Sequence, residues 1–433
     1  MATGAVAADG LLVTVGDVTP TSAVVWARGA APGAARVDVA PVGAVPVRAG
    51  NVEFSTSRDL TGKLVVSALA PSTRYAYRVS AGTRSVSGEF VTAPPADAVT
   101  PFTFAWSGDL GGGNVCRHVQ AGYPVFRAIT ARHPQFFLFV GDTIYADRAC
   151  QGPDRVPGYG FIATTLAGYH DKHRYNRADG PVQAAFRTTS VYAIWDDHEV
   201  RNDFSGPTEP LMPAGRQAFL DYWPIVPPEA EPHRLHRQFR WGKLLDLFIL
   251  DTRQYRSPNS EVDSPGKTML GAAQRRWLID GVTASDAVWK VVVSSVSLAI
   301  PTGRRERRDS WTNATVFGLP DPGGTGFMHE RDAILAALRG VKNLVVVTAD
   351  VHHAEVIRHT PAAGFVLHEL IAGPLSASTG TPRPLDQTLN AVSLWGRGGV
   401  NNFGEVTVEA TQLVVRIIDE AGTVLTTQTI GRD

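Results

Sequence analysis

Four short apolar runs in this chain end in acidic or histidine residues, and this pattern limits what the chain can fold into. The runs are FTFAWSGDL (102–110), FFLFVGDTIYAD (136–147), VYAIWDDHEVRNDF (191–204) and NLVVVTADVHHAEV (343–356). Runs of β-branched and aromatic residues without polar alternation are typical of strands covered on both faces, as in a parallel sheet flanked by helices. Ligands of such sheets bind beyond the carboxyl ends of the strands. The sequence therefore predicts that these polar groups lie close together at one edge of the sheet.

The side chains at these strand ends are of the types that bind metal ions. Carboxylates, a phenol and imidazoles at one edge suit one or two cations, and two cations can clamp both oxygens of an in-line displacement. A single aspartate at a strand end is more typical of a helix cap or a turn, but four such ends are poorly explained by four separate caps. The pattern predicts a metal-assisted hydrolase that uses Asp109, Asp142, Tyr145, Asp197, His198, Asp350 and His352.

The order and spacing of the segments resemble the PhoD-like alkaline phosphatases and phosphodiesterases of the metallophosphoesterase superfamily. Besides the runs above, LDTRQYR (250–256) and AGPLSAS (372–378) carry the resemblance. It implies a fibronectin III-like all-β sandwich over residues 1–97 and an α/β, four-layer αββα metallophosphoesterase domain over 98–433. It also implies hydrolysis of phosphate esters, in which hydroxide generated by metal ions attacks phosphorus in line.

The resemblance also implies roles for individual residues. The implied metal ligands are Asp109, Asp142, Tyr145, Asp197, Asp350 and His352, and Asp142 bridges two ions. His198 is the implied catalytic residue beside the phosphate. The expected substrate-binding residues are Asn202, His353 and Arg253, although a structural ion pair with Asp251 accounts for Arg253 equally well.

Two departures from the family pattern bear on which metals bind. A tyrosinate ligand favours a trivalent ion such as iron at the first site, but Gly108 and Asp109 replace a Ser-Cys pair found in many relatives. The segment KVVVSSVSLAI (290–300) offers serines where related phosphoesterases supply a histidine. The second site is therefore oxygen-rich and suits calcium or another divalent ion.

Two alternative functions follow from the same residues. One is a phosphodiesterase that acts on phospholipid or teichoic-acid-like polymers, because we see no C-terminal helix that would cover the site. The other is a surface binding protein with a structural metal site. A structural site is normally closed by protein ligands, which disfavours this second alternative.

Composition agrees with a two-domain enzyme. A chain of 433 residues is long for a single core, and its net charge of zero gives no electrostatic reason to expect a nucleic-acid or membrane partner. The apolar runs are too short for a transmembrane segment. Short alternating segments fill the first hundred residues, as in a β-sandwich, and APPADAVTP (93–101) is the expected linker.

The two cysteines, Cys116 and Cys150, follow the first and second runs. Adjacent parallel strands would bring these loops together, so either a disulfide forms or Cys116 supplies a thiolate ligand. A disulfide would imply an oxidising compartment and an extracytoplasmic or secreted protein. MATGAVAADG contains no signal peptide, which favours a processed chain and leaves a cytoplasmic location as the alternative. The oligomeric state cannot be inferred.

The remaining predictions concern helices and loops. Amphipathic patterns predict helices over Ala121–Arg132 and Met328–Leu338, and the tail after residue 402 predicts alternating strands. The polar run YHDKHRYNRADGP (169–181) is expected near the site entrance, as a solvated surface segment or a substrate-binding one. The loop over 301–327 is rich in Gly and Pro, and we expect Trp311 there to form a wall for the leaving group.

Overall fold

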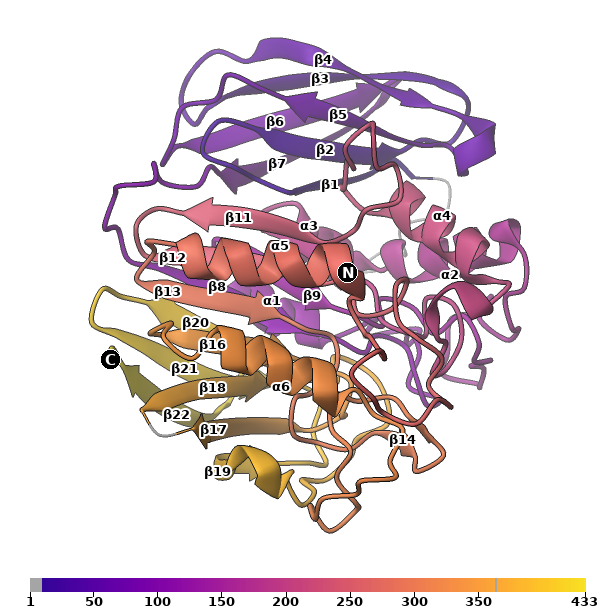
Figure 1. Ribbon diagram of the computed structural model, residues 1–433. Helices are drawn as coiled ribbons and strands as arrows, with labels where there is room; N and C mark the ends of the chain where they lie inside the picture. Colours follow the sequence, from indigo (N-terminus) through magenta and orange to yellow (C-terminus); the bar gives the residue numbers. More distant parts are fainter. Residues whose placement is uncertain (1–9, 363) are drawn as a thin grey trace.

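The structure is a computed structural model that describes residues 10–362 and 364–433. Its strands form two large sheets, a four-stranded sheet and a short hairpin (Figure 1). In spatial order the nine-stranded sheet contains β22 (Val424–Gly431), β21 (Gln412–Asp419), β20 (Asn402–Val408), β8 (Phe102–Ser107), β9 (Phe136–Val140), β10 (Ser190–Ile194), β1 (Leu12–Gly16), β2 (Ala23–Arg28) and β5 (Thr61–Val66). The seven-stranded sheet contains β11 (Arg237–Trp241), β12 (Leu245–Ile249), β13 (Trp289–Val293), β16 (Leu344–Thr348), β18 (Phe365–Ile371), β17 (Ala354–Ala362) and β19 (Val392–Arg397). The four-stranded sheet contains β4 (Val47–Phe54), β3 (Gly33–Pro41), β6 (Arg74–Ala81) and β7 (Arg84–Val91), and the hairpin joins β14 (Gly303–Arg304) to β15 (Arg307–Arg308).

The two large sheets pack face to face because their central strands are apolar on both sides. In β9 the side chains alternate: the ring of Phe136 lies 4.7 Å from that of Trp241 in β11 of the other sheet. The ring of the next residue, Phe137, lies 6.3 Å from that of Phe126 in α1 (Val125–Arg132). Successive residues of a strand point to opposite faces, so one face of this sheet meets a second sheet and the other meets helices.

Helices also cover the outer face of the seven-stranded sheet, which gives the order helix, sheet, sheet, helix. Figure 1 shows α5 (Gly271–Ala284) and α6 (Met328–Ala337) lying across it. Phe248 of β12 packs toward Trp277 of α5, whereas its neighbour Leu247 joins the core between the sheets. The side chains of β8, β9, β10 and β16 are thereby buried on both faces, as the sequence predicts.

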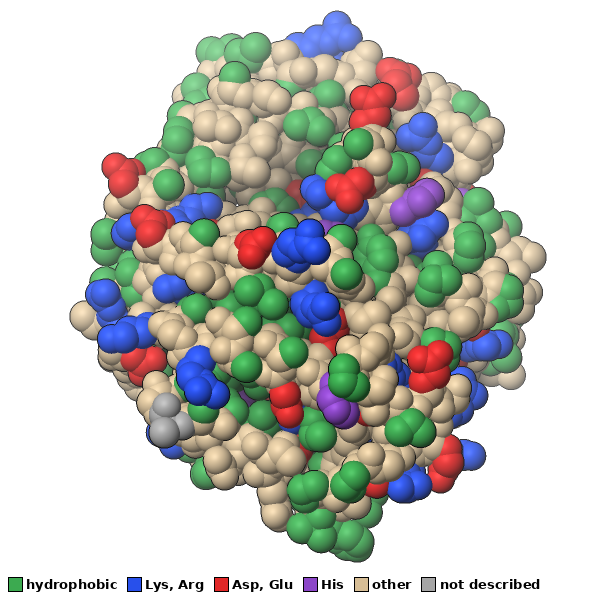
Figure 2. Space-filling model, in the orientation of Figure 1, with side chains coloured by type: hydrophobic (Ala, Val, Ile, Leu, Met, Phe, Trp, Pro, Cys, Tyr) green, Lys and Arg blue, Asp and Glu red, His purple; other side chains and the backbone are tan. Residues whose placement is uncertain are grey.

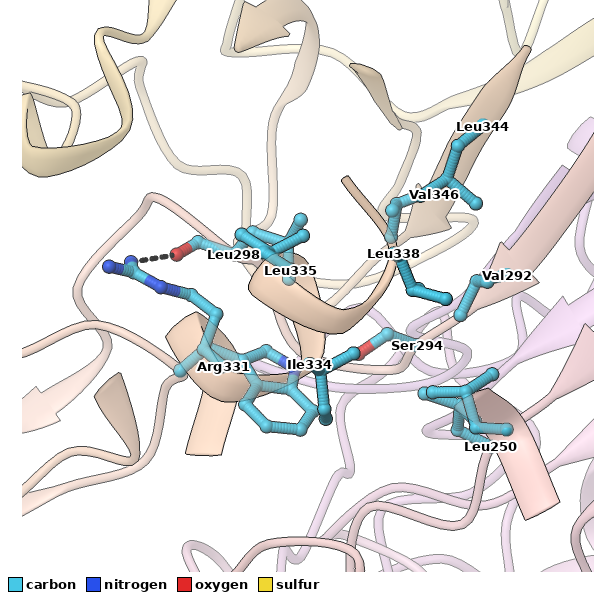
Figure 3. Close-up of a pocket in the computed structure, with 12 residues that line it drawn as sticks. Leu250, Val292, Ser294, Leu298, Arg331, Ile334, Leu335, Leu338, Leu344 and Val346 are labelled. Carbon is cyan, nitrogen blue, oxygen red and sulfur yellow. Dashed lines mark hydrogen bonds between the residues drawn. The ribbon is translucent and has the colours of Figure 1, made fainter. Parts of the chain in front are cut away.

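A small apolar cavity lies beneath α6 (Figure 3). Val292 and Val346 of the sheet and Ile334 of the helix line it, and none of the three is more than 7% exposed. Trp311 lies in this cavity wall, where its Nε1 donates a hydrogen bond to Ser294 Oγ at 3.1 Å. The expectation that Trp311 forms a wall for the leaving group is therefore wrong. This large apolar ring is buried in the core instead.

The N-terminal strands extend the nine-stranded sheet. β1 pairs with β10 in parallel through Gly16 and Val191, and β2 and β5 follow outward. The four-stranded sheet packs against these three strands through buried side chains such as Val37 and Val79. Apart from one 3₁₀ turn at Thr56–Arg58, all regular elements in residues 10–100 are β-strands, as predicted. Among the described residues, no helix is both long and apolar enough to cross a membrane.

Two predicted helices and the predicted terminal strands are present. α1 begins at Val125, four residues later than predicted, because Pro124 precedes it and lacks the N–H that a helix interior needs. α6 ends one residue before the predicted end. The tail forms β20, β21 and β22, joined as antiparallel neighbours.

The polar run at 169–181 differs from its prediction as a solvated surface segment. It lies largely in α2 (Leu166–Arg177), most of whose polar residues are buried, and α2 packs against α4 (Met212–Tyr222). His170 Nε2 lies 2.9 Å from the Asp221 carboxylate, and the Arg177 guanidinium lies 4.3 Å from the Trp26 ring. A carboxylate pairs with His170, and aromatic rings and a backbone carbonyl surround Arg177, so these polar side chains do not indicate exposure.

Candidate metal centre and active site

The four predicted strand ends meet at one edge of the paired sheets. Asp109 follows β8, Asp142 follows β9, Asp197 follows β10 and Asp350 follows β16, each by two or three residues. Asp109, Asp142 and Asp350 have φ angles of 64°, 51° and 66°. This left-handed conformation is uncommon outside glycine and is tolerated best by short polar residues such as aspartate. The strained turns aim three carboxylates at the same small volume.

One group of potential ligands lies at the first strand end. Asp109, Asp142 and His352 place one ligand atom each within 4.8 Å of one another. The hydroxyl of Tyr145 lies 3.0 Å from His352 Nε2. The Nδ1 atom of His352 hydrogen-bonds the carbonyl of Ser378, so Nε2 is the nitrogen left to face the group.

A second group lies beside the first, and a third set of residues links the two. Asp196, Asp197 and Asp350 lie within 4.8 Å of one another, and a third set joins Asp142, Asp197 and His198. Asp142 therefore belongs to sets on both sides, which is the position required of a bridging ligand. Asp197 Oδ2 accepts a hydrogen bond from the Asp203 backbone N–H at 2.6 Å, whereas its Oδ1 has no hydrogen-bond partner and lies 3.8 Å from Arg253 Nη2.

The charges at these two groups fit bound cations. Asp109 Oδ2, Asp196 Oδ2, Asp197 Oδ1 and Asp350 Oδ2 are buried without a hydrogen-bond partner. Burial first, and then repulsion between neighbouring carboxylates, raises the pKa values of Asp109, Asp142 and Asp350 well above the usual range. Buried carboxylate oxygens are costly unless they are paired or coordinate a metal. The residues present therefore fit a site for metal ions.

His198 and Asp147 form a pair at the pocket wall. His198 Nδ1 lies 2.6 Å from Asp147 Oδ1, and Asp147 Oδ2 accepts a hydrogen bond from the Asn202 backbone N–H at 3.0 Å. Burial lowers the pKa of His198, but the charge of Asp197 and the bond to Asp147 outweigh it and raise that pKa to about 9. Burial would raise the pKa of Asp197, whereas His198 and Arg253 together lower it below the usual range.

Comparison with known proteins identifies the family of this chain. The family model "PhoD-like phosphatase" matches residues 105–417, and the model "PhoD-like phosphatase, N-terminal domain" matches residues 9–94. The chain belongs to the PhoD-like phosphatase family. Alkaline phosphatase D of Bacillus subtilis (strain 168) is 26% identical over 389 residues, which are 78% of this chain and 64% of that protein. The chain thus spans less than two thirds of the length of this relative.

Solved structures support the same fold. A structure of PhoD superposes with a TM-score of 0.78 at 20% identity, and the match covers 99% of this chain and 94% of the other. The purple acid phosphatase PPD1 from yellow lupin (Lupinus luteus) seeds gives a TM-score of 0.68 at 12% identity, over 98% of this chain and 75% of the other. The PhoD-like chain therefore shares its overall fold with both.

The PhoD-like site opens into a pocket, and the structure places most of the predicted residues at it. Asp109 and Asp142 lie at its base, where each is 1% exposed. The lining residues include Asn114, Tyr145, Arg148, Asp197, His198, Asn202, Asp203, Thr302, Asp350, His352, Ser378 and Arg383. Two exposed arginines thus stand at the mouth of a strongly acidic centre.

Two of the expected substrate-binding residues lie away from this pocket. His353 is 0% exposed, and its ring nitrogens lie 3.0 Å from Val351 O and from Glu355 Oε2. Arg253 is also 0% exposed, with its Nε 2.6 Å from Asp196 Oδ1 and both terminal nitrogens 2.7 Å from the Asp309 carboxylate. Arg253 therefore sits beneath the PhoD-like site, where it neutralises acidic residues rather than facing solvent.

Sequence reasoning missed several residues that support the PhoD-like site. Glu199 Oε1 accepts hydrogen bonds from the N–H and hydroxyl of Thr143 at 2.6 and 2.7 Å, and Glu199 Oε2 accepts one from Asp196 N at 2.9 Å. Asp147, the last residue of GDTIYAD, was visible in the motif but carried no predicted role. Asp196 belongs to the second ligand group without having been predicted, although of these two neighbouring aspartates only Asp197 lines the pocket.

The two cysteines are joined. Cys116 and Cys150 form a disulfide with an S–S distance of 2.00 Å. It connects the loop after β8 to the loop after β9, which are the loops that carry Asp109 and Asp142. The alternative of a thiolate ligand from Cys116 is therefore wrong, because its sulfur is already bonded.

Proposed function

We propose that this chain hydrolyses phosphate esters with the help of two or more metal ions. The observation that carries this proposal is a set of buried carboxylate oxygens without hydrogen-bond partners, in two groups that Asp142 and Asp197 link beside an open pocket. Membership of the PhoD-like phosphatase family supports it, as does the relative called alkaline phosphatase D.

The two groups of ligands differ in chemistry. Asp109, Asp142, Tyr145 and His352 would hold the first ion, and the phenolate of Tyr145 suits a trivalent ion such as iron. Asp142, Asp197 and Asp350 would hold the second, and an all-oxygen set suits calcium or another hard divalent ion. Tyr145 needs such an ion to ionise, because burial and the charge of Asp142 raise its pKa well above the usual range.

The ions would lower the pKa of water and screen the charge that develops on the phosphoryl oxygens. The protein's own side chains then orient the substrate and protonate the leaving group. Asp147 holds the Nδ1–H of His198, which leaves Nε2 to give a proton to the leaving alkoxide as the ester P–O bond breaks. Asn202 lines the pocket and offers its amide N–H to a non-bridging oxygen, while its Oδ1 accepts a hydrogen bond from Arg148 Nη2 at 3.1 Å.

The pocket mouth favours a substrate with a second negative charge or a chain that continues into solvent. Arg148 and Arg383 are both exposed and line the pocket from different loops. This arrangement supports diesters, including phospholipid or teichoic-acid-like polymers, as a second candidate class of substrate beside simple monoesters.

Three further features belong to the proposal. Domains over 1–97 and 98–433 are supported by the limits of the two family models. A fibronectin III-like sandwich is supported by the pairing of β1, β2 and β5 in one sheet and β4, β3, β6 and β7 in the other. An extracytoplasmic or secreted location is supported by the disulfide, since such bonds persist in oxidising compartments.

The test is metal analysis of the purified chain, with hydrolysis rates for p-nitrophenyl phosphate and bis-p-nitrophenyl phosphate before and after chelation. We expect two bound ions and turnover that chelation abolishes, and the ratio of the two rates chooses between monoesters and diesters. Tightly bound metal without turnover of either ester would favour the surface binding protein.

A matched pair of variants sharpens this test. Asp142→Asn removes the shared ligand, and we expect it to lose metal and at least about 10²-fold in activity, because even residues that only support metal ligands cost 10 to 100-fold. Asp246→Asn changes a buried carboxylate that pairs with Arg240 far along β12. It should leave both metal content and turnover intact. Full metal content and turnover in Asp142→Asn would contradict the proposed bridging role.

A further inference from the structure

Asn176 lies near the end of α2 and is 1% exposed, and it does not line the pocket. Its side-chain Nδ2 donates two hydrogen bonds, one to the carbonyl oxygen of Leu110 at 3.1 Å and one to that of Thr143 at 2.9 Å. Leu110 directly follows Asp109, and Thr143 directly follows Asp142. A single amide group therefore joins the two loops that carry the proposed first ligands.

The two bonds hold peptides that follow strained residues. Asp109 and Asp142 have positive φ angles, which cost free energy for any residue with a side chain and persist only where the surroundings fix them. The carbonyl that Asn176 binds belongs in each case to the next residue, so its direction is tied to the strained turn. A direct bond from Leu110 N to Asp142 O at 2.8 Å joins the same two turns.

The orientation of the amide is itself fixed. The hydroxyl of Tyr123 donates to Asn176 Oδ1 at 2.7 Å, so the amide nitrogen must point toward the two carbonyls. An aspartate at this position would set an acceptor against two acceptors, and an alanine would leave two buried carbonyls unpaired. The site thus requires a side chain with two donors and one acceptor in a plane.

The helix that carries Asn176 is anchored on the N-terminal strands. The neighbouring Arg177 donates to Tyr222 O at 3.0 Å and to the hydroxyl of Thr14 in β1. One turn earlier, Arg174 pairs with Asp59 at 3.2 Å. These bonds tie the end of α2 to the sandwich, so Asn176 has little freedom to follow a shift of the ligand loops.

We propose that Asn176 is a positioning residue, whose amide holds the loops after β8 and β9 in the register that brings Asp109 and Asp142 to metal-binding distance. This inference rests on the proposed function, because it assigns Asn176 a role at the same metal site. It acts through the two aspartates and does not touch the substrate.

The experiment uses the full chain, stripped of metal and titrated with Mn²⁺, with the free ion quantified by electron paramagnetic resonance. We expect Asn176→Ala and Asn176→Asp to bind Mn²⁺ about 10 to 100-fold more weakly than the wild type, the usual cost of losing a group that orients metal ligands. With saturating Mn²⁺, kcat for p-nitrophenyl phosphate should fall at least tenfold while KM changes less than threefold. Tyr123→Phe keeps the Asn176 amide but removes the hydroxyl that fixes its orientation. It should therefore lower Mn²⁺ affinity and kcat as the Asn176 variants do, but by smaller factors.

Asn343→Ala is the matched control. Asn343 also joins two backbone groups, donating to Val288 O at 2.9 Å and accepting from Asp433 N at 2.8 Å. It lies at the start of β16, at the opposite end of the strand from Asp350. This variant should lose stability but keep its Mn²⁺ affinity and its ratio of kcat to KM. A purely structural role for Asn176 would give it the same profile.

The outcomes separate the two proposals. If the wild type binds two Mn²⁺ ions and hydrolyses an ester, but folded Asn176→Ala binds Mn²⁺ within twofold of it, the inference about Asn176 is overturned and the proposed function stands. If Asn176→Ala does not fold, unchanged Mn²⁺ affinity in Tyr123→Phe overturns the inference in the same way. If the wild type binds Mn²⁺ without hydrolysis, the proposed function fails and the affinities still decide the role of Asn176. If the wild type binds no Mn²⁺, both fail.

Discussion

Removal of the disulfide should destabilise the protein strongly, and the size of the effect can be worked out from the chain separation. Cys116 and Cys150 are 34 residues apart. In the chain-entropy account, closing a loop of that length lowers the entropy of the unfolded chain by about 12.6 cal/mol/K, or about 3.8 kcal/mol at 25 °C. Both cysteines are buried beside Tyr145 and Tyr159, so alanine, which adds no buried polar group, is the appropriate replacement.

The measurement is the free energy of unfolding from urea titrations of the wild type and of the double variant Cys116→Ala/Cys150→Ala. We expect a loss of about 3 to 4 kcal/mol, since the entropic gain of a cross-link and the small loss of sulfur packing act in the same direction. Wild-type protein titrated in a reducing agent serves as the control and should match the double variant. A difference below about 1 kcal/mol between oxidised wild type and double variant would refute the reasoning, because it would mean that the linked loops do not unfold with the core.

Three further changes have defined outcomes. Asp147→Asn should lower kcat about 10²-fold while metal content stays the same, because Asp147 acts through His198, and equal kcat values would exclude that role. Gly373→Ala would place a Cβ 2.6 Å from Asp109 Oδ2, so the metal affinity measured by chelator competition should fall at least about tenfold. Gly340→Ala is the control: its Cβ would meet nothing within 4 Å, so its metal affinity should match that of the wild type. Val346→Ile adds one methylene toward the cavity beneath α6 and should raise the free energy of unfolding by about 0.8 kcal/mol in urea titrations, whereas a decrease would show that the cavity is too narrow.

The meeting of the candidate ligands at one sheet edge could be predicted because each of these residues is tied to a local signal. Asp109 and Asp142 follow their apolar runs by two residues, and parallel strands place their carboxyl ends at one edge whatever the rest of the chain does. The grouping of Asp142 with partners on both sides agrees with its predicted position between two ions, although the bridging role itself stays a prediction. Local sequence is enough to place Asp109 and Asp142, because each lies only two residues beyond the end of its strand.

Residues whose roles depend on distant partners could not be predicted in the same way. The charge of Arg253 suggested a substrate phosphate, but its partners Asp196 and Asp309 lie 57 and 56 residues away along the chain. His353 stands next to a potential ligand, yet it directly precedes β17, and its ring is buried in the core beside Glu355. The neighbouring residues in the sequence indicate neither whether a charged side chain is buried nor which residue pairs with it.

The clearest failure, the run at 169–181, shows what the site requires beyond its ligands. A helix with three cationic residues, Lys172, Arg174 and Arg177, in its last two turns is typical of a solvated surface, and here it is largely buried between the N-terminal strands and the ligand loops. Arg177 and Asn176 are adjacent in sequence but face opposite neighbours: Arg177 bonds Thr14 and Tyr222, whereas Asn176 bonds the peptides after Asp109 and Asp142. Strained turns persist only where surrounding groups fix them, so a centre built on such turns needs a polar, buried support. In α2 this support comes from the polar side chain of Asn176, and hydrophobic pattern alone could not have located it.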